Sequence, residues 1–334
     1  MTSPILEVKG LSKHFAQRSG LLGRLSGSAA GSIPAVDDVS FALAENETLG
    51  LVGESGCGKT TTGKAILKLM PVTAGTIHYR GRDITPLSPG EFRPLRREIQ
   101  MIFQDLDAAL NPKMRIESIL HEAIGLREPE LDADGLRHRA YELLELVNLK
   151  KNKLANFPSE LSGGEKRRIG IARVLAVQPK LIVADEPTSA LDVSIQAQVI
   201  NLLRDLQDQF GLSYLFISHD LPLVELVSHR VAVMYLGQIV ELGLAQRIAT
   251  APRHPYTSVL WSSLAEKRSH EAVTGTAPAW GAFDFERPSG GCRFAPRCPV
   301  YAARGKPAEC TDPNNAPRLR GIEDGHAVAC HFPL

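Results

Sequence analysis

The sequence has no hydrophobic run long enough to cross a membrane as a helix, and it carries almost no net charge. A membrane helix needs about 20 consecutive apolar residues, and no segment of the 334-residue chain approaches that length. The 38 basic and 37 acidic residues leave a net charge of +1, whereas broad nucleic-acid binding needs a basic face. The first residues, MTSPILEVKG, lack the apolar stretch of a secretory signal. We therefore expect a cytosolic protein that works at a membrane only through other subunits.

Cysteine is scarce until the end of the chain. Cys57 stands alone early in the sequence, and the other four are Cys292, Cys298, Cys310 and Cys330. In a reducing compartment such clustering favours metal ligation over disulfide bonds. Hydrophobic residues make up 43% of the chain and charged residues 22%, which excludes a disordered or fibrous protein.

Predicted strands and helices alternate along most of the chain. Apolar patterns predict strands at 5–15, 39–43, 48–53, 99–103, 181–185 and 212–218. Helical spacing predicts helices at 63–70, within 106–165, at 166–178 and at 195–210. This order implies an α/β fold with a mostly parallel sheet. The Gly- and Ser-rich residues 16–34 are interpreted as a flexible connection, and periodicity fades after about residue 265.

A phosphate-binding motif follows the predicted strand at 48–53. GESGCGKT fits the pattern G-x-x-x-x-G-K-[ST] and opens a helix, as its mechanism requires. Glycines let backbone N–H groups approach phosphates, and the helix N-terminus adds positive potential. Lys59 would reach the β- and γ-phosphates, Thr60 would ligate Mg²⁺, and Thr61 would bond the α-phosphate. The expected ATP contacts are Gly53, Glu54, Ser55, Gly56, Cys57, Gly58, Lys59, Thr60 and Thr61.

Cys57 lies inside this motif, two residues from Lys59 and next to a helix N-terminus. Such surroundings lower the pKa of a thiol and increase its reactivity. We therefore expect alkylation of Cys57 to block ATP binding. The alternative is a small side chain that serves only to fit the loop.

An acidic element complements the motif. In LIVADE, residues 181–186, four apolar residues form a buried strand and Asp185 emerges at its carboxyl end. Asp185 would hold Mg²⁺, in part through water. Glu186 is then placed to orient or deprotonate the attacking water.

The segment LSGGEKRRIGIARVL, residues 161–175, provides a second anion-binding helix terminus. One nucleotide seldom needs two such sites from one chain, so this terminus would bind ATP held by a partner chain. Here the sequence resembles the ATP-binding cassette ATPases over about residues 5–250. That resemblance implies a P-loop, RecA-like core with an N-terminal antiparallel β-subdomain and an α-helical subdomain at about 106–165.

The resemblance also assigns roles to residues that match its motifs in order. Gln104 in MIFQD matches the glutamine that touches Mg²⁺ and the attacking water, and His219 in ISHD matches the histidine that contacts the γ-phosphate. Phe15 stands where an aromatic ring stacks on adenine. The residues implied to act across a dimer interface are Ser162, Gly163 and Gly164 of the second terminus and Asp192 of SALD. Glu165 and Cys57 depart from the usual Gln and Ser without removing a required donor.

The segment RHPYTSVLWSSL, residues 253–264, resembles the start of the C-terminal extension of the oligopeptide and dipeptide importer ATPases. The resemblance implies an ATPase domain at 1–252 and an extension at 253–334. It also implies a related second ATPase subunit, two transmembrane permeases, an extracytoplasmic solute-binding protein and a peripheral place on the cytoplasmic face of the membrane. The cargo stays open among dipeptides, oligopeptides, nickel, glutathione and other solutes. The alternatives are a soluble cassette ATPase acting on DNA or ribosomes, and a P-loop kinase, which gives no reason for LSGGE or SALD.

The four late cysteines match neither a zinc-finger spacing nor the ferredoxin run. Four thiolates suit either tetrahedral Zn²⁺ or a [4Fe–4S] cluster, and the Gly- and Pro-rich chain around them needs a staple. His326 and His331 are possible substitute ligands. Resemblance to peptide-importer ATPases, some of which carry a cluster here, favours iron–sulfur, with zinc or unmetallated thiols as the alternatives.

Overall fold

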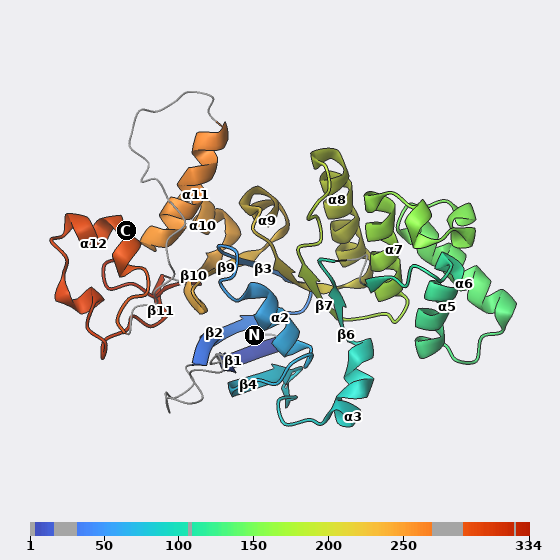
Figure 1. The fold of residues 1–334 in the computed structure, drawn as a ribbon, viewed down its shortest axis with the longest axis horizontal. Coiled ribbons are helices and arrows are strands. Elements are labelled where there is room, and N and C mark those ends of the chain that lie inside the picture. The colour runs from blue at the N-terminus through green and yellow to red at the C-terminus, as the bar shows by residue number, and fades with distance from the viewer. Residues whose placement is uncertain (1–3, 17–31, 106–108, 269–289, 324) are drawn as a thin grey trace, which may run out of the picture.

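The computed structural model describes residues 4–16, 32–105, 109–268, 290–323 and 325–334. Within them the strands form two sheets (Figure 1). The antiparallel sheet has the order β2 (Ser32–Leu43), β1 (Leu6–Ala16), β4 (Ala74–Tyr79) and β5 (Arg82–Asp83). The second sheet has the order β11 (Arg320–Glu323), β12 (His326–Val328), β10 (Gln238–Leu244), β9 (Arg230–Tyr235), β3 (Thr48–Val52), β8 (Ser213–Ile217), β7 (Leu181–Asp185) and β6 (Ile99–Ile102).

The middle of the second sheet is parallel, from β9 through β3, β8 and β7 to β6. It is buried on both faces, because alternate residues of its strands enter two separate hydrophobic cores. Ile182 and Phe216 belong to one core, whereas Val183 and Leu215 belong to the other. This burial explains why the strands were readable as continuous apolar runs. The mixed α/β fold with its additional antiparallel sheet confirms the predicted class.

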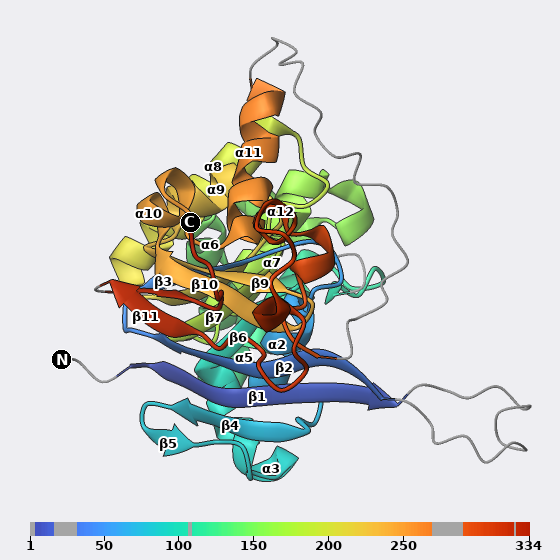
Figure 2. The ribbon, with the colours of Figure 1, turned by 90° about the vertical axis from the view of Figure 1, so that its left-hand side faces the viewer.

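Helix α2 (Lys59–Ile66) lies between the two sheets (Figure 2) and contacts strands of both. It begins earlier than the predicted 63–70. At the other end of the molecule lie α5 (Ile116–Arg127), α6 (Ala133–Leu146), η2 (Lys151–Ala155), η3 (Pro158–Glu160) and α7 (Gly163–Leu175) (Figure 1). The remaining helices of the core are α3 (Pro89–Phe92), η1 (Arg93–Arg97), α8 (Val193–Phe210), α9 (Leu221–Val227) and α10 (Ala245–Thr250).

The C-terminal residues continue the core sheet. After α11 (Pro255–Arg268), the chain forms η4 (Ala295–Arg297), α12 (Pro299–Ala303) and η5 (Ala308–Cys310). Strand β12 then pairs antiparallel with β10, and β11 pairs with β12. Residues from the far end of the sequence therefore extend the sheet beyond β10, with β11 as its edge strand (Figure 2).

Most of the predicted connection at 16–34 and the start of the predicted helical segment lie outside the described residues, at 17–31 and 106–108. Across the parts of the chain that the structure does describe, no helix is both long and apolar enough to span a bilayer.

Candidate nucleotide-binding and hydrolysis site

The predicted phosphate loop joins β3 to α2 through a left-handed backbone path. Gly53 has φ 151° and Gly58 has φ 113°. A Cβ atom at Gly53 would come within 2.1 Å of the Met234 carbonyl oxygen, and one at Gly58 within 2.3 Å of the Ala35 carbonyl oxygen. Only glycine fits both positions. The loop can therefore present its backbone N–H groups to an anion at the start of α2.

Lys59 is buried, with 6% of its surface exposed. Its Nζ donates hydrogen bonds to the carbonyl oxygens of Gly53, at 2.7 Å, and Glu54, at 3.0 Å. The ammonium group is thus folded over the loop, where a bound phosphate would lie.

Two oxygen donors meet beside the loop. Thr60 Oγ1 donates to Asp185 Oδ1 at 2.9 Å, and Asp185 is 2% exposed at the end of β7. Burial raises the pKa of the Asp185 carboxyl, while the Thr60 hydrogen bond lowers it. A hydroxyl and a carboxylate oxygen are ligands that Mg²⁺ prefers, so this pair fits the predicted magnesium site.

Glu186 lies at the centre of a cluster whose members come from three separate segments of the chain. Gln104 Nε2 donates to Glu186 Oε2 at 2.7 Å, and His219 Nδ1 lies 3.0 Å from Glu186 Oε1. The Glu186 backbone has φ 46°, and its N–H donates to the Ile217 carbonyl of the neighbouring strand at 2.9 Å. The structure thereby brings all three predicted hydrolysis residues together at the carboxyl ends of the strands.

Arg167 is a residue that sequence reasoning missed. It is 4% exposed, and burial lowers the pKa of its guanidinium. Its nitrogens donate to the carbonyl oxygens of Phe103 at 2.9 Å, Gln104 at 3.3 Å and Ser189 at 3.4 Å. Arg167 therefore ties the Gln104 segment to the SALD segment. Nothing in KRR distinguishes it from its neighbours, because only the fold shows which arginine turns inward.

The predicted second anion site is the N-terminus of α7, which Figure 1 places apart from α2. Ser162 Oγ accepts the Glu165 N–H at 3.2 Å, and the Glu165 carboxylate accepts the Ser162 N–H at 3.1 Å. Asp192 similarly caps α8 by accepting the Ile195 N–H at 2.9 Å. Gly163 and Gly164 lie in the first turn of α7. Their action on a partner's nucleotide stays a prediction.

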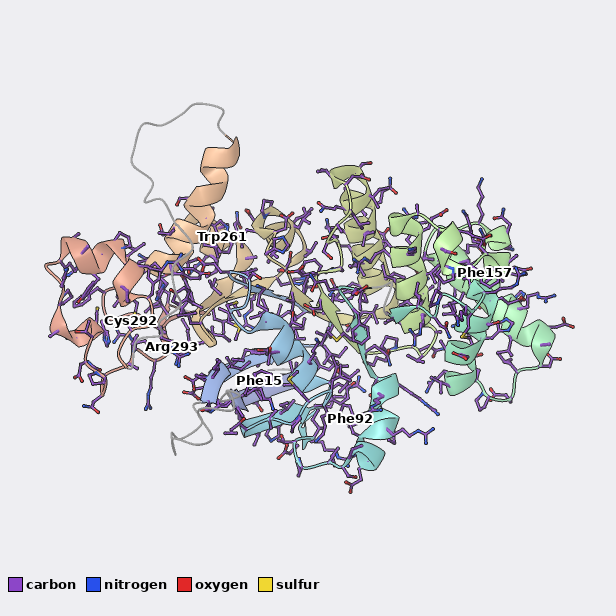
Figure 3. All side chains as sticks on the ribbon, viewed as in Figure 1. Phe15, Phe92, Phe157, Trp261, Cys292 and Arg293 are labelled. Atoms are coloured by element: carbon purple, nitrogen blue, oxygen red, sulfur yellow. The ribbon has the colours of Figure 1, made fainter. Side chains whose placement is uncertain are left out.

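Phe15 is 43% exposed near the end of β1, and the Lys13 ammonium lies 5.2 Å from its ring centre (Figure 3). An exposed ring is available for stacking on a base. Its contact with adenine stays a prediction.

The predicted lowering of the Cys57 pKa is wrong. The thiol is 3% exposed, and burial raises its pKa despite Lys59 Nζ at 3.8 Å. Desolvation of a thiolate outweighs the nearby charge here. The packing explanation, a small side chain that fits the loop, agrees with this burial.

The four late cysteines are free thiols that line one pocket, together with His331. Burial raises the pKa of Cys292 and of Cys330 to about 11. Over the residues described, no three His, Cys, Asp or Glu side chains are arranged to hold a metal ion. His326 does not act as a spare ligand, because its Nε2 lies 2.7 Å from the buried carboxylate of Glu241. The arrangement as it stands gives no direct support for a metal centre.

Comparisons with known proteins agree with this site. A family profile described as ABC transporter matches residues 36–189, and one described as the C-terminal region of oligopeptide/dipeptide transporters matches residues 240–304. A putative peptide import ATP-binding protein of Brucella ovis is 43% identical over 333 residues, covering 98% of each chain. The oligopeptide transport ATP-binding protein AppF of Bacillus subtilis is 44% identical over 336 residues, covering 98% of this chain and 97% of AppF.

Solved structures share the fold. The dimeric ATP-binding cassette MJ0796 bound to ADP and Pi is 26% identical with a TM-score of 0.63, covering 72% of this chain and 98% of that one. The cbiO1 protein of Clostridium perfringens is 23% identical with the same TM-score of 0.63, covering 79% of this chain and 96% of its own. Fold and site define a P-loop ATPase that uses ATP and Mg²⁺. The chain belongs to the ABC transporter family, in the branch that carries the oligopeptide/dipeptide transporter C-terminal region.

We predict that Cys57 resists alkylation in the folded protein. Its burial and raised pKa leave little accessible thiolate at pH 7.5. Iodoacetamide labelling followed by peptide mass spectrometry should show Cys57 reacting more slowly than in the urea-unfolded chain. Rapid labelling of the native chain with loss of ATP binding, both abolished by Cys57→Ser, would contradict this expectation.

Proposed function

We propose that this chain is the ATP-hydrolysing subunit of an importer for di- or oligopeptides, lying on the cytoplasmic face of the membrane. The joint presence of the Glu186 cluster and the matched C-terminal region carries this proposal. The names of the full-length relatives, which are peptide import ATP-binding proteins, support the choice of cargo. The alternative of a soluble cassette acting on DNA or ribosomes has no comparable support.

We propose that the chain divides into two parts, as its resemblance to the importer ATPases implies. Residues 1–252 would form the ATPase domain, with its helical part at about 106–165, and residues 253–334 would form the transporter-specific extension. The matched ranges 36–189 and 240–304 fall on either side of this division, apart from a short overlap.

The residues of the site suit phosphoryl transfer to water. The loop N–H groups and Lys59 would hold the β- and γ-phosphates, while Thr60, Asp185 and Gln104 would hold the hydrated Mg²⁺. Bound magnesium would neutralise charge that develops on the phosphate oxygens. Glu186 would take the proton of the attacking water, and His219 would orient the γ-phosphate. Catalysis then consists of positioning and charge stabilisation.

A second ATPase chain, of related rather than identical sequence, would complete the site. The Ser162–Gly164 terminus of one chain would face the nucleotide on the phosphate loop of the other, and Asp192 would lie at the interface. The separation of α7 from α2 within one chain supports this arrangement, as does the dimeric state of MJ0796. ATP would close the pair, and hydrolysis would reopen it.

We predict that Glu186→Gln preserves ATP binding and lowers turnover at least 100-fold, because the amide cannot accept the proton of the water. Turnover can be followed by phosphate release, and binding by titration with a fluorescent ATP analogue. Glu225→Gln on the exposed face of α9 is the matched control and should behave as wild type. Near-normal turnover in Glu186→Gln would remove Glu186 from its role. If the ATP-loaded variant does not pair with its cognate subunit, the proposed two-chain arrangement is wrong.

A groove on this chain suits the permease. Its volume is about 1070 Å³, and it lies between η1 and β6 on one side and α5 and α7 on the other. Phe103 and Leu126, 38% and 55% exposed, are among its lining residues, along with several arginines. Phe103 directly precedes Gln104, so a permease helix seated here would contact the segment that holds Glu186. A solute-binding protein outside the membrane would deliver the cargo to the two permeases.

We predict that Leu126→Glu abolishes transport by the assembled importer and leaves ATP binding by the isolated chain unchanged. A carboxylate in the apolar part of the groove opposes docking of an apolar helix. Leu244→Glu places the same charge on a 48% exposed leucine outside the groove and serves as the control. Transport by Leu126→Glu that equals the control would place the permease contact elsewhere.

We propose a [4Fe–4S] cluster as the cofactor of the extension, with zinc as the second choice. The four cysteines line one pocket, and holding a cluster would require their thiols to draw together around the iron. Anaerobically purified protein should be brown with about four iron atoms per chain. Cys298→Ser should lose them, and Cys57→Ser should keep them. Colourless wild-type protein without bound metal would exclude both metals.

A further inference from the structure

The C-terminal extension reaches into the nucleotide site at Glu54, the second residue of the phosphate loop. Arg297, at the end of η4, donates from both terminal nitrogens to the two oxygens of the Glu54 carboxylate, each at 2.9 Å. The backbone N–H of Glu54 donates to the Tyr256 hydroxyl at 3.0 Å. Both the side chain and the backbone of this loop residue are therefore held by residues beyond position 252. This bidentate contact fixes the orientation of the Glu54 carboxylate as well as its distance from Arg297.

Both holding groups sit in a packed aromatic cluster. Tyr256 is 1% exposed, and its ring centre lies 4.6 Å from that of Tyr235 and 5.4 Å from that of Phe294. The Arg297 guanidinium lies 5.7 Å from the Tyr235 ring centre. Because Tyr235 ends β9, which pairs with the loop-bearing strand β3, the cluster is anchored on the core sheet.

Hydrogen bonds also hold the backbone just before Tyr256 in place. The Glu241 carboxylate is fully buried and accepts the N–H groups of Arg253, at 2.6 Å, and His254, at 2.8 Å. His254 Nδ1 accepts the Tyr256 N–H at 3.0 Å, and burial lowers the pKa of His254 to about 3, which keeps the ring neutral as an acceptor. The HPY segment therefore presents the Tyr256 hydroxyl from a fixed position.

A second set of contacts connects the extension to the phosphate loop. Arg293 pairs with the Asp37 carboxylate and donates to the Leu236 carbonyl oxygen. The next residue, Gly237, donates its N–H to the Cys57 carbonyl oxygen at 2.8 Å. Figure 3 shows Arg293 beside Cys292 in the C-terminal extension.

We infer that Tyr256 and Arg297 are positioning residues that hold the phosphate loop in its ATP-binding form. They touch Glu54 and not the reacting atoms. A loop held in advance loses less freedom when ATP binds, so affinity rises without any added contact to the nucleotide. This role concerns ATP binding alone and is independent of the cargo.

Tyr256→Phe is the sharpest test, because it keeps the buried ring and removes only the hydroxyl that accepts the Glu54 N–H. In the full-length chain we expect the Kd for a fluorescent ATP analogue to rise roughly three- to tenfold, and the KM for ATP of the chain paired with its cognate ATPase subunit should rise by the same factor. The kcat at saturating ATP should stay within twofold of wild type. Arg297→Gln should act in the same direction, and Arg297→Lys should be intermediate because it keeps the charge without the fork.

A double-mutant cycle separates positioning from general stabilisation. In a Glu54→Gln chain, where the carboxylate partner is already lost, Arg297→Gln should raise KM less than twofold further. The control is Arg247→Gln, which breaks an exposed ion pair with Glu323 in the same part of the molecule and should leave KM unchanged. An unchanged KM in both Tyr256→Phe and Arg297→Gln would overturn the inference. A loss of kcat with unchanged KM would also overturn it, since that marks a purely structural role.

Discussion

The close approach of backbone to backbone around the phosphate loop is the constraint on which the rest of the site depends. Carbonyl oxygens of Ala35 and Met234 crowd Gly58 and Gly53 so tightly that no side chain fits. The loop can then point its N–H groups inward and start α2 at Lys59. Because β3 lies in the middle of a parallel sheet, the adjacent strand β8 and the next strand β7 deliver the Ser218–His219 turn and Asp185 to the same edge as the loop.

The residues proposed for hydrolysis are organised around the Glu186 carboxylate. Glu186 takes a hydrogen bond from Gln104 on one oxygen and contacts His219 with the other. Arg167 fixes the chain on the Gln104 side by binding the Phe103 and Gln104 carbonyl oxygens from α7. Helix α7, whose N-terminus is proposed to face a partner's nucleotide, is thereby joined by hydrogen bonds to the segment that carries Gln104. Movement of the helical part relative to the core would be felt at Glu186.

The sequence was most informative where burial was complete and contacts were local. The runs at 181–185 and 195–210 predicted β7 and most of α8 because apolar periodicity alone determines those elements. Strands β9 and β10 were not predicted, although they are largely buried and pair with each other across a short turn. Strand β12 was not predicted because it is short and pairs with β10, which lies far away along the chain. The predicted direction of the Cys57 pKa shift is wrong because the sequence shows the neighbouring charge but not the depth of burial. The contact between Arg297 and Glu54 could not be predicted either, because the two residues are 243 positions apart and no local pattern indicates that they meet.

The pairing of β12 with β10 has a consequence for synthesis on the ribosome. Strand β10 is made well before β12, and until then its outer edge offers unpaired N–H and C=O groups to any other strand. Contacts that join such distant segments form late. During translation β10 is therefore the edge strand of the sheet until β12 has been made, and a product that terminates before β12 keeps β10 at the edge.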